Sequence, residues 1–232
     1  KKFLEKSGLK FNRRDFLEIA LTHRSYLNEH PEYKLGHNER QEFLGDAVLE
    51  MIVTDYLFRH YDNPEGDLTA WRAALVNTDM LAKVAEELSL RDVLRMSKGE
   101  AVSGKERARL HILANTVEAL IGGIYLDQGY AAAEKFVRRK IIDKHLDEIL
   151  RECLWKDPKT LLQEKTQKFL SATPRYETVK EEGPDHNKSF TVEVYLGEKA
   201  VAVGSGPSKQ EAQRRAARAA LKKKGWDKVE EI

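Results

Sequence analysis

The spacing of apolar residues changes near residue 155, and this change limits the folds that the chain can adopt. Before that point, apolar residues recur at helical spacing over the ranges 38–61, 79–88, 109–127 and 130–150. After it, the pattern predicts a helix over 160–169, strands over 175–182, 188–196 and 199–204, and a last helix that ends near 224. The sequence therefore predicts an α+β protein, in which an all-helical part is followed by a small α-β-β-β-α part.

Local signals place the boundaries of these two parts. Asp157 and Pro158 suit the N-cap and the first turn of a helix. Ser208, followed three residues later by Glu211, forms a capping box at the start of the last helix. We therefore assign domains to residues 1–150 and 158–226, with a linker over 151–157 and a tail over 227–232.

Composition excludes several classes of protein. With 41% hydrophobic residues the chain can bury a core, which argues against a disordered tail protein. A single cysteine, Cys153, excludes an internal disulfide framework and a zinc site built on several cysteines. No apolar run reaches about 18 residues, and the charged residues 1–5 contain no apolar signal-peptide core. We expect a cytoplasmic protein with no membrane partner.

The two parts also differ in charge. Residues 156–232 contain 16 Lys and Arg against 12 Asp and Glu, whereas residues 1–155 contain 24 against 26. A basic part joined to an acidic part indicates that the C-terminal part meets a polyanion. Ordinary surface variation would explain a difference of this size equally well.

Three carboxylates lie on a helix that otherwise reads as buried. At about 100° per residue, Glu39, Glu42 and Asp46 fall within an arc of roughly 60°. The rest of this helix is apolar nearly all round, and a helix of that kind is normally buried. Because buried carboxylates are unfavourable without a compensating positive charge, the pattern indicates a cation or ion pairs at this place.

A second helix has the same property. The segment 110–126 is apolar on every side, and two of its few polar residues, Asn115 and Glu118, share a face. Gly122, one turn further along that face, would allow another helix to approach closely. We expect His111, one turn before Asn115, to be a core histidine or to support a ligand. Oxygen ligands on two buried helices are what a hard cation such as Mg²⁺ requires.

Ion pairs offer an alternative explanation for these acids. The arginines that would supply them are Arg40, Arg72, Arg107 and Arg109. A cluster of carboxylates on two central helices favours a functional site instead, because such clusters tend to mark one. Glu65, in the loop before Gly66, is by itself typical of a solvated turn residue.

Two segments resemble a known family. The segment Asn38–Leu49, NERQEFLGDAVL, closely resembles the signature of bacterial ribonuclease III. The segment Leu113–Gly123, LANTVEALIGG, resembles the second acidic segment of that family. The α-β-β-β-α part resembles a double-stranded RNA-binding domain, so the resemblance covers essentially the whole chain in the expected order.

The resemblance implies an all-helical endonuclease domain that hydrolyses duplex RNA. The reaction would depend on Mg²⁺, with Mn²⁺ as a substitute and no small-molecule cofactor, and would leave 5′-phosphate and 3′-hydroxyl ends with short 3′ overhangs. The resemblance also implies a role in processing ribosomal, messenger and other structured RNA. It implies a homodimer formed around the signature helix, in which we expect Phe43 to be an interface anchor.

The resemblance further implies roles for individual residues. The metal-binding positions are Glu42, Asp46, Asn115 and Glu118. Asp46 and Glu118 are implied to be catalytic, together with Glu39 and Glu65, which match acidic positions that support cleavage.

One position departs from the family pattern. The family normally has Asp where this chain has Asn115, and an amide keeps a carbonyl oxygen but loses the negative charge. The amide is therefore a poorer Mg²⁺ ligand, and we expect weakened metal affinity. Three interpretations remain open: a tolerated natural residue, an inactivating substitution, or a degenerate member that binds duplex RNA without cutting it.

Three sets of residues in the C-terminal part resemble the RNA contacts of its family. They are Thr160, Gln163 and Glu164 on the first helix, Pro184, Asp185 and His186 after the first strand, and Ser208, Lys209 and Arg214 at the start of the last helix. Duplex RNA is recognised largely by shape, through minor-groove 2′-hydroxyls and the phosphates across the groove. The basic face over 214–224 could equally be an ordinary solvated surface.

The aromatic residues of this part are expected to serve its core and not to form a platform for single strands. They include Phe169, Tyr176, Phe190 and Tyr195. The alanines at 212, 216, 217 and 220 are expected to pack against the sheet.

Two rival functions fit parts of the sequence. A binding protein of the same fold would protect or regulate structured RNA, and Asn115 favours it. A metal-dependent phosphohydrolase for small molecules would leave the RNA-binding part without a purpose. Binding of duplex RNA without cleavage in Mg²⁺ would support the binding protein, and hydrolysis of free nucleotides would support the phosphohydrolase.

Overall fold

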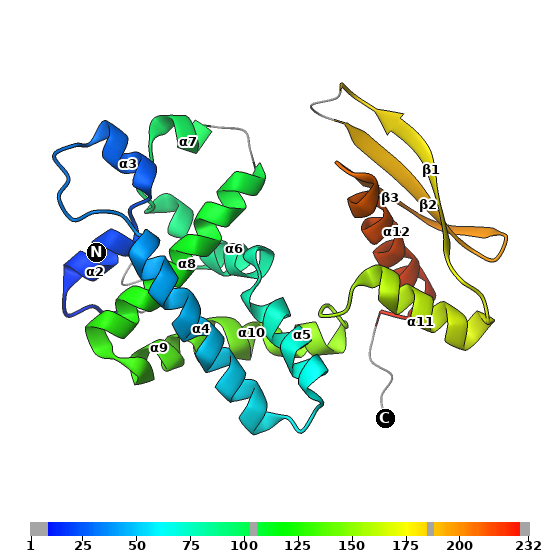
Figure 1. Cartoon of the computed structure of the whole chain (residues 1–232), viewed down its shortest axis with the longest axis horizontal. Coiled ribbons are helices and arrows are strands. Elements are labelled where there is room, and N and C mark those ends of the chain that lie inside the picture. The colour runs from blue at the N-terminus through cyan, green and yellow to red at the C-terminus, as the bar shows by residue number, and fades with distance from the viewer. Residues whose placement is uncertain (1–8, 103–105, 185–187, 228–232) are drawn as a thin grey trace. The chain divides into compact units, whose positions relative to one another are not determined.

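Helices build the first of two compact units into which the chain divides, Lys1–Asp147 and Glu148–Ile232 (Figure 1). The computed structural model describes residues 9–102, 106–184 and 188–227. The helical elements of the first unit are α2 (Arg14–Ala20), α3 (Arg24–Glu29), α4 (Glu39–His60), α5 (Glu65–Val76), α6 (Thr78–Glu87), the 3₁₀ turn η1 (Leu90–Asp92), α7 (Lys98–Val102), α8 (Glu106–Gln128), α9 (Tyr130–Val137), the π-helical turn η2 (Arg138–Ile142) and α10 (Asp143–Arg151), whose end crosses into the second unit.

The two long helices α4 and α8 form the centre of this unit, and glycines bring them into close contact. A Cβ on Gly45 of α4 would overlap the backbone carbonyl of Glu118 on α8. A Cβ on Gly122 of α8 would overlap the backbone carbonyl of Gln41 on α4. The expectation that Gly122 permits a close approach is confirmed. This contact places the acidic residues of the two helices next to each other.

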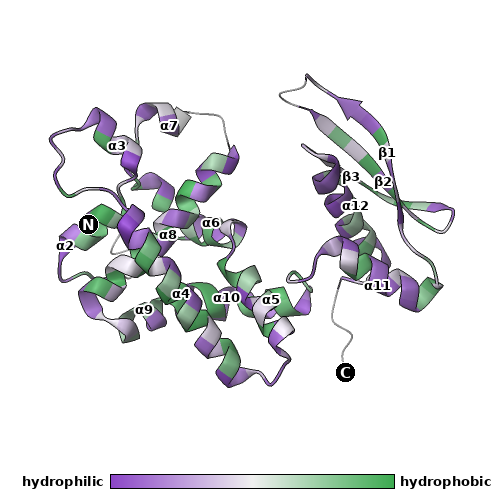
Figure 2. Cartoon of the chain, in the orientation of Figure 1, coloured by the Kyte–Doolittle hydropathy of each residue, from purple (hydrophilic) through white to green (hydrophobic). Residues whose placement is uncertain are grey.

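The prediction that α4 is buried nearly all round is wrong. Phe43, Met51 and Phe58 are 83%, 62% and 75% exposed, and they lie on one face of the helix. On the opposite side, Leu49, Ile52 and Val53 are buried. Figure 2 shows hydrophobic and hydrophilic residues interleaved along α4. Apolar periodicity alone could not distinguish a core face from one that stays exposed in a single chain.

Three further expectations about the first unit need correction. The segment with Glu65 is not a loop, because Glu65 is the first residue of α5 and Pro64 precedes it as the N-cap. The single helix expected over 130–150 is divided into α9 and α10 by the π turn η2. His111 is exposed and therefore is not a core histidine.

The second unit has the order helix, three strands, helix. Its elements are α11 (Pro158–Leu170), β1 (Arg175–Glu182), β2 (Ser189–Leu196), β3 (Lys199–Gly206) and α12 (Lys209–Lys224). The strands form an antiparallel sheet in the order β1-β2-β3, and α12 packs against β2 and β3 (Figure 1). The α+β architecture expected from the sequence is therefore confirmed.

The core of this unit lies between the sheet and the two helices. It contains Leu161, Leu162, Val194, Leu196, Ala216, Ala217, Ala220 and Leu221. The alanines at 212, 216, 217 and 220 are fully buried, as expected. Phe169 is 47% exposed, so the expectation that it belongs to the core is wrong. Across the described residues of both units, no helix is long and apolar enough to cross a membrane.

Candidate active site and RNA-binding surface

Four of the expected site residues meet where α4 and α8 cross. Glu42 and Asp46 lie one turn apart on α4, and Asn115 and Glu118 lie one turn apart on α8. The side-chain amide of Asn115 donates a hydrogen bond from Nδ2 to Oε1 of Glu42, with 2.7 Å between the two atoms. The structure therefore joins the two acidic segments that were separate in the sequence.

Two acids of this cluster, Glu42 and Glu118, have raised pKa values. The pKa of Glu118 is raised to about 8. Burial is the largest cause, and the nearby carboxylates of Asp46, Glu42 and Glu50 add to it. Burial also raises the pKa of Glu42; the hydrogen bond from Asn115 lowers it, and the charges of Glu39 and Asp46 add to the rise. A bound cation would relieve this repulsion and lower both pKa values.

The cluster is less buried than the sequence predicted. Glu42 and Glu118 are half-buried, and Asp46 is exposed. Within the described residues, no three His, Cys, Asp or Glu side chains are grouped closely enough to hold a metal ion. Asn115 presents its donor nitrogen to Glu42, so its amide must turn over before Oδ1 can serve as a ligand. The donor types, carboxylate and amide oxygens, fit a hard cation.

Glu39 and Glu65 have other partners. Oε1 of Glu39 lies 3.4 Å from Nη1 of Arg24, and its other oxygen lies 3.8 Å from Nδ1 of His37. Glu65 accepts a hydrogen bond of 2.9 Å from the hydroxyl of Thr69, one turn further along α5. The structure therefore places Glu39 on the same helix as Glu42, and Glu65 at the start of a different helix.

Glu50 is a further acid that the sequence analysis missed. It follows Asp46 by one turn of α4 and contributes to the raised pKa of Glu118. Its own ion pair is with Arg72, at 2.9 Å. Arg72, one of the arginines proposed to neutralise the cluster, therefore pairs with Glu50 at its edge. The four-residue spacing from Asp46 was the signal that could have identified it.

The expected RNA contacts of the second unit are exposed. Ser208 caps α12 by accepting a hydrogen bond from the backbone N–H of Glu211. Several of the other residues already form ion pairs: Glu164 with Lys156 at 2.8 Å, Lys209 with Glu181 at 3.7 Å, and Arg214 with Asp157 at 3.3 Å. Thr160, Gln163 and Pro184 are also exposed, whereas Asp185 and His186 lie outside the described residues.

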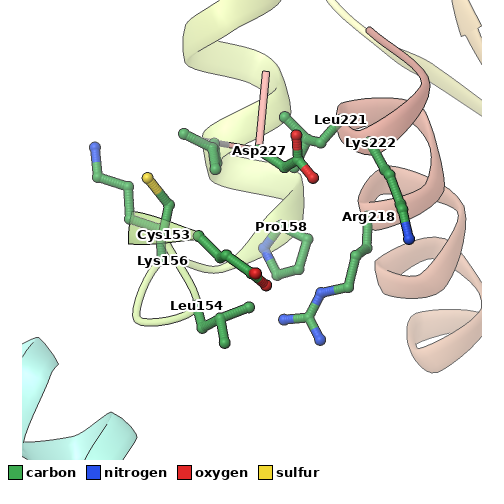
Figure 3. Close-up of a pocket in the computed structure, with 10 residues that line it drawn as sticks. Cys153, Leu154, Lys156, Pro158, Arg218, Leu221, Lys222 and Asp227 are labelled. Carbon is green, nitrogen blue, oxygen red and sulfur yellow. The ribbon is translucent and has the colours of Figure 1, made fainter. Parts of the chain in front are cut away.

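A cavity in the second unit does not include any of the carboxylates discussed above (Figure 3). Its volume is about 320 Å³, and it lies between the segment 152–158 and the C-terminal half of α12. Buried Cys153 and Leu221 provide apolar walls, and Arg218 and Lys222 extend from α12 beside it.

Comparisons with known proteins agree with this arrangement. A family model described as ribonuclease-III-like matches residues 14–145, and a model of the double-stranded RNA binding motif matches residues 158–224. The ribonuclease 3 of Carboxydothermus hydrogenoformans is 47% identical over 215 residues, which cover 92% of this chain and 91% of that protein. The chain belongs to the ribonuclease III family. The ribonuclease 3 of Borreliella afzelii is 44% identical over 95% of this chain and 89% of its own length.

A solved structure extends the comparison for this ribonuclease III. The nuclease domain of ribonuclease III from Campylobacter jejuni superposes with a TM-score of 0.53 and 37% sequence identity, over 62% of this chain and 97% of that one. As a ribonuclease III with both domains, the chain is an endoribonuclease specific for double-stranded RNA. Nucleases of this family generally use a divalent metal ion.

Proposed function

We propose that this ribonuclease III hydrolyses duplex RNA in a Mg²⁺-dependent reaction at the cluster formed by Glu42, Asp46, Asn115 and Glu118. Mn²⁺ would substitute for Mg²⁺, and no small-molecule cofactor is required. The products would carry 5′-phosphate and 3′-hydroxyl ends with short 3′ overhangs. Ribosomal, messenger and other structured RNA in the cytoplasm would be the substrates.

The observation that carries this proposal is the convergence of Glu42, Asp46 and Glu118 where α4 and α8 cross, at a place where burial and neighbouring carboxylates raise the pKa of Glu118. A carboxyl whose pKa is raised to about 8 binds a proton near neutral pH unless a cation replaces it. Such perturbed groups tend to mark functional sites. When bound, a divalent cation would supply a deprotonated water and neutralise charge on the reacting phosphate and the leaving oxygen.

The chain's own residues would have distinct tasks in this reaction. Glu118 and Asp46 would be the catalytic carboxylates, Glu118 releasing its proton when the cation is held. Glu42 would hold the cation, and Asn115 would turn its amide so that Nδ2 leaves Glu42 and the carbonyl oxygen faces the cation. Glu39 and Glu65, outside this set, would support cleavage by engaging the RNA near the scissile bond.

We also propose that the second unit binds duplex RNA through its exposed polar residues. Thr160, Gln163 and Glu164 would face one minor groove, and the loop that contains Pro184 and His186 would face the next. Ser208, Lys209 and Arg214 would contact phosphates at the start of α12, where helix dipole and backbone N–H groups favour anions. In this proposal the domains are residues 1–150 and 158–226, joined by a linker over 151–157, and each domain binds RNA through its own surface.

The exposed apolar face of α4 supports a homodimer. Phe43, Met51 and Phe58 would pack against the same face of a second copy, with Phe43 as the anchor beside the acidic cluster. Phe43→Asp should therefore halve the mass measured by light scattering, whereas Val203→Asp, at an exposed apolar position of the second unit, should not. A monomeric wild type, or a variant that remains dimeric, would contradict this assignment.

Cleavage of a long perfect RNA duplex in Mg²⁺ tests the main proposal. The wild type should cut, and Glu118→Gln should cut at least about a hundredfold more slowly while it still binds the duplex. Glu106→Gln, an exposed position on the same helix, is the matched control. Mass spectrometry of the products would establish their ends. Equal rates for Glu118→Gln and the wild type would refute the proposed site.

The hydrogen bond between Asn115 and Glu42 favours one second candidate, a protein that binds duplex RNA without cutting it. This bond occupies an oxygen that a metal would otherwise use. Binding without cleavage, both in the wild type and in Asn115→Asp, would establish that function in place of the first.

A further inference from the structure

The end of α11 and the residue pair after α12 form an exposed aromatic surface in the second unit. The rings of Phe169 and Trp226 stack with their centroids 5.2 Å apart and their planes 25° from parallel. Phe169 is 47% exposed, and Trp226 packs in part against the core. We call these two rings the aromatic platform. An aromatic residue that the core does not cover offers a π surface to a ligand.

Lysine side chains surround the aromatic platform. The Nζ atoms of Lys165 and Lys168 lie 5.9 Å and 5.3 Å from the ring centroid of Phe169. The Nζ atom of Lys224 lies 5.8 Å from the ring centroid of Trp226. Exposed aromatic rings among positive charges are the combination that binds single-stranded nucleic acid, because bases stack on the rings and phosphates attract the charges.

The basic character continues beyond the platform. Asp227, which follows Trp226, lines the cavity of Figure 3, and Arg218 and Lys222 line the same cavity from α12. The carboxylates of Glu152 and Asp227, which also line the cavity, offset part of this charge. A strand that leaves the platform would therefore find two more cationic groups within the same unit, which suits a polyanion better than an uncharged ligand.

The platform does not share a face with the expected duplex contacts. At about 100° per residue, Phe169 lies roughly 120° to 180° around α11 from Thr160, Gln163 and Glu164. A stiff duplex that contacts those residues does not also cover Phe169. A flexible single strand can turn around the end of the helix, which lies only about 9 Å along the axis from Gln163.

We propose that the aromatic platform binds single-stranded RNA that flanks the duplex. An unpaired base would stack on the face of Phe169 that Trp226 does not cover and so extend the stacked pair, and its neighbouring phosphates would contact Lys165, Lys168 and Lys224. The inference rests on the proposed function in one respect, namely that the second unit holds the adjoining duplex. Duplexes with single-stranded flanks would then be better ligands than blunt duplexes.

Fluorescence anisotropy with the full chain in EDTA, which prevents metal-dependent cleavage, tests this proposal. One RNA is a blunt duplex of about 20 base pairs, longer than the roughly 16 that one such domain spans, and the other adds a 3′ tail of about ten uridines. The tail should raise the affinity of the wild type about fivefold to tenfold, because one stacked base contributes on this scale.

Variants separate stacking from general effects. Phe169→Leu keeps an apolar side chain against Trp226 but removes the π face, and should abolish the gain from the tail. Leu170→Ala, at the neighbouring and equally exposed position, should keep it. Lys224→Gln should reduce the gain, and Lys180→Gln, an exposed lysine of β1, should not.

Quenching of tryptophan fluorescence by single-stranded oligouridine gives a direct readout, and Trp226→Phe should remove it. A tail that leaves wild-type affinity unchanged, a gain that survives Phe169→Leu, or quenching that survives Trp226→Phe would each overturn the proposal. Affinity for the blunt duplex should stay the same in all these variants, and it reports separately on the proposed function. If the wild type failed to bind the blunt duplex, the proposed duplex contacts would be refuted instead.

Discussion

The substitution Asn115→Asp tests the role of the position at which the sequence analysis expects aspartate in this family. In the structure, Nδ2 of Asn115 donates to Oε1 of Glu42 over 2.7 Å. Aspartate removes the donor and places a second carboxylate against Glu42, which already lies near Asp46 and Glu118. Without a metal ion the variant should therefore be less stable than the wild type, and with one it should gain more.

The contacts set the size of the effect. A hydrogen bond to a charged acceptor contributes about 1.5 to 3 kcal/mol. Two carboxylates about 4 Å apart repel each other by up to about 4 kcal/mol at an effective dielectric constant near 20, and protonation or rotation of one of them avoids most of this energy. We expect a loss of about 2 to 3 kcal/mol in EDTA. For a unit of this size, that loss lowers Tm by about 5 to 10 °C.

Thermal unfolding in EDTA and across a Mg²⁺ titration measures both effects. The added charge should tighten Mg²⁺ binding about tenfold, and the Tm of the variant should rise more steeply with Mg²⁺ than that of the wild type. Asn28→Asp, which adds the same charge at an exposed position of α3, is the control. An unchanged Tm in EDTA would show that the bond to Glu42 contributes nothing. An unchanged Mg²⁺ dependence would show that position 115 does not face the metal.

Two further predictions follow from the crossing of α4 and α8. Because the pKa of Glu118 is raised from 4.5 to about 8, the folded state holds this proton more tightly than the unfolded state. The unfolding free energy of the wild type, measured by urea titration in EDTA, should therefore fall as pH rises from about 4.5 to about 8. In Glu118→Gln this fall should be smaller. An equally large fall in the variant would contradict the assignment of the raised pKa to Glu118. Gly45→Ala should lower the unfolding free energy by about 3 kcal/mol or more, because the new Cβ would overlap the backbone carbonyl of Glu118. Gly66→Ala, which has open space around its Cβ position, should change the unfolding free energy by less than about 1 kcal/mol. Similar denaturation midpoints for the two variants would refute the close packing of α4 and α8.

Local spacing was enough to predict which residues of the candidate site share a face of each helix. Glu42 and Asp46 lie one turn apart on one face, as do Asn115 and Glu118, and helical periodicity depends only on nearby residues. Gly122 predicted a close helix contact, and the structure has one against Gln41. Sequence could not show that Asn115 donates to Glu42, because the partner lies 73 residues away and the contact depends on how the helices pack.

Burial was the property that spacing could not provide. Phe43 and Phe169 are apolar at helical positions, and both are exposed in the structure. An apolar side chain is removed from water either by packing within its own chain or by packing against a partner chain. The spacing of apolar residues in the sequence is the same in both cases. Glu65 was misplaced for a different reason: proline and glycine next to it indicated a loop, whereas proline also suits the start of a helix, and α5 begins there.

The structure also bears on the three interpretations of Asn115. Any asparagine at this position, natural or introduced, brings the same donor, because its side chain has the shape of aspartate with an NH₂ group in place of one oxygen. Here the amide satisfies Glu42 and lowers its pKa against the effects of burial and of Glu39 and Asp46. Asparagine thus stabilises the metal-free cluster, and it also reduces the negative charge available to hold a cation. Functional sites commonly show such a trade-off between stability and activity. The same bond fits both functions proposed above, and cleavage separates them: an active enzyme with a higher Mg²⁺ requirement than aspartate would give cuts duplex RNA at high Mg²⁺, whereas a binding protein does not cut it at any Mg²⁺ concentration.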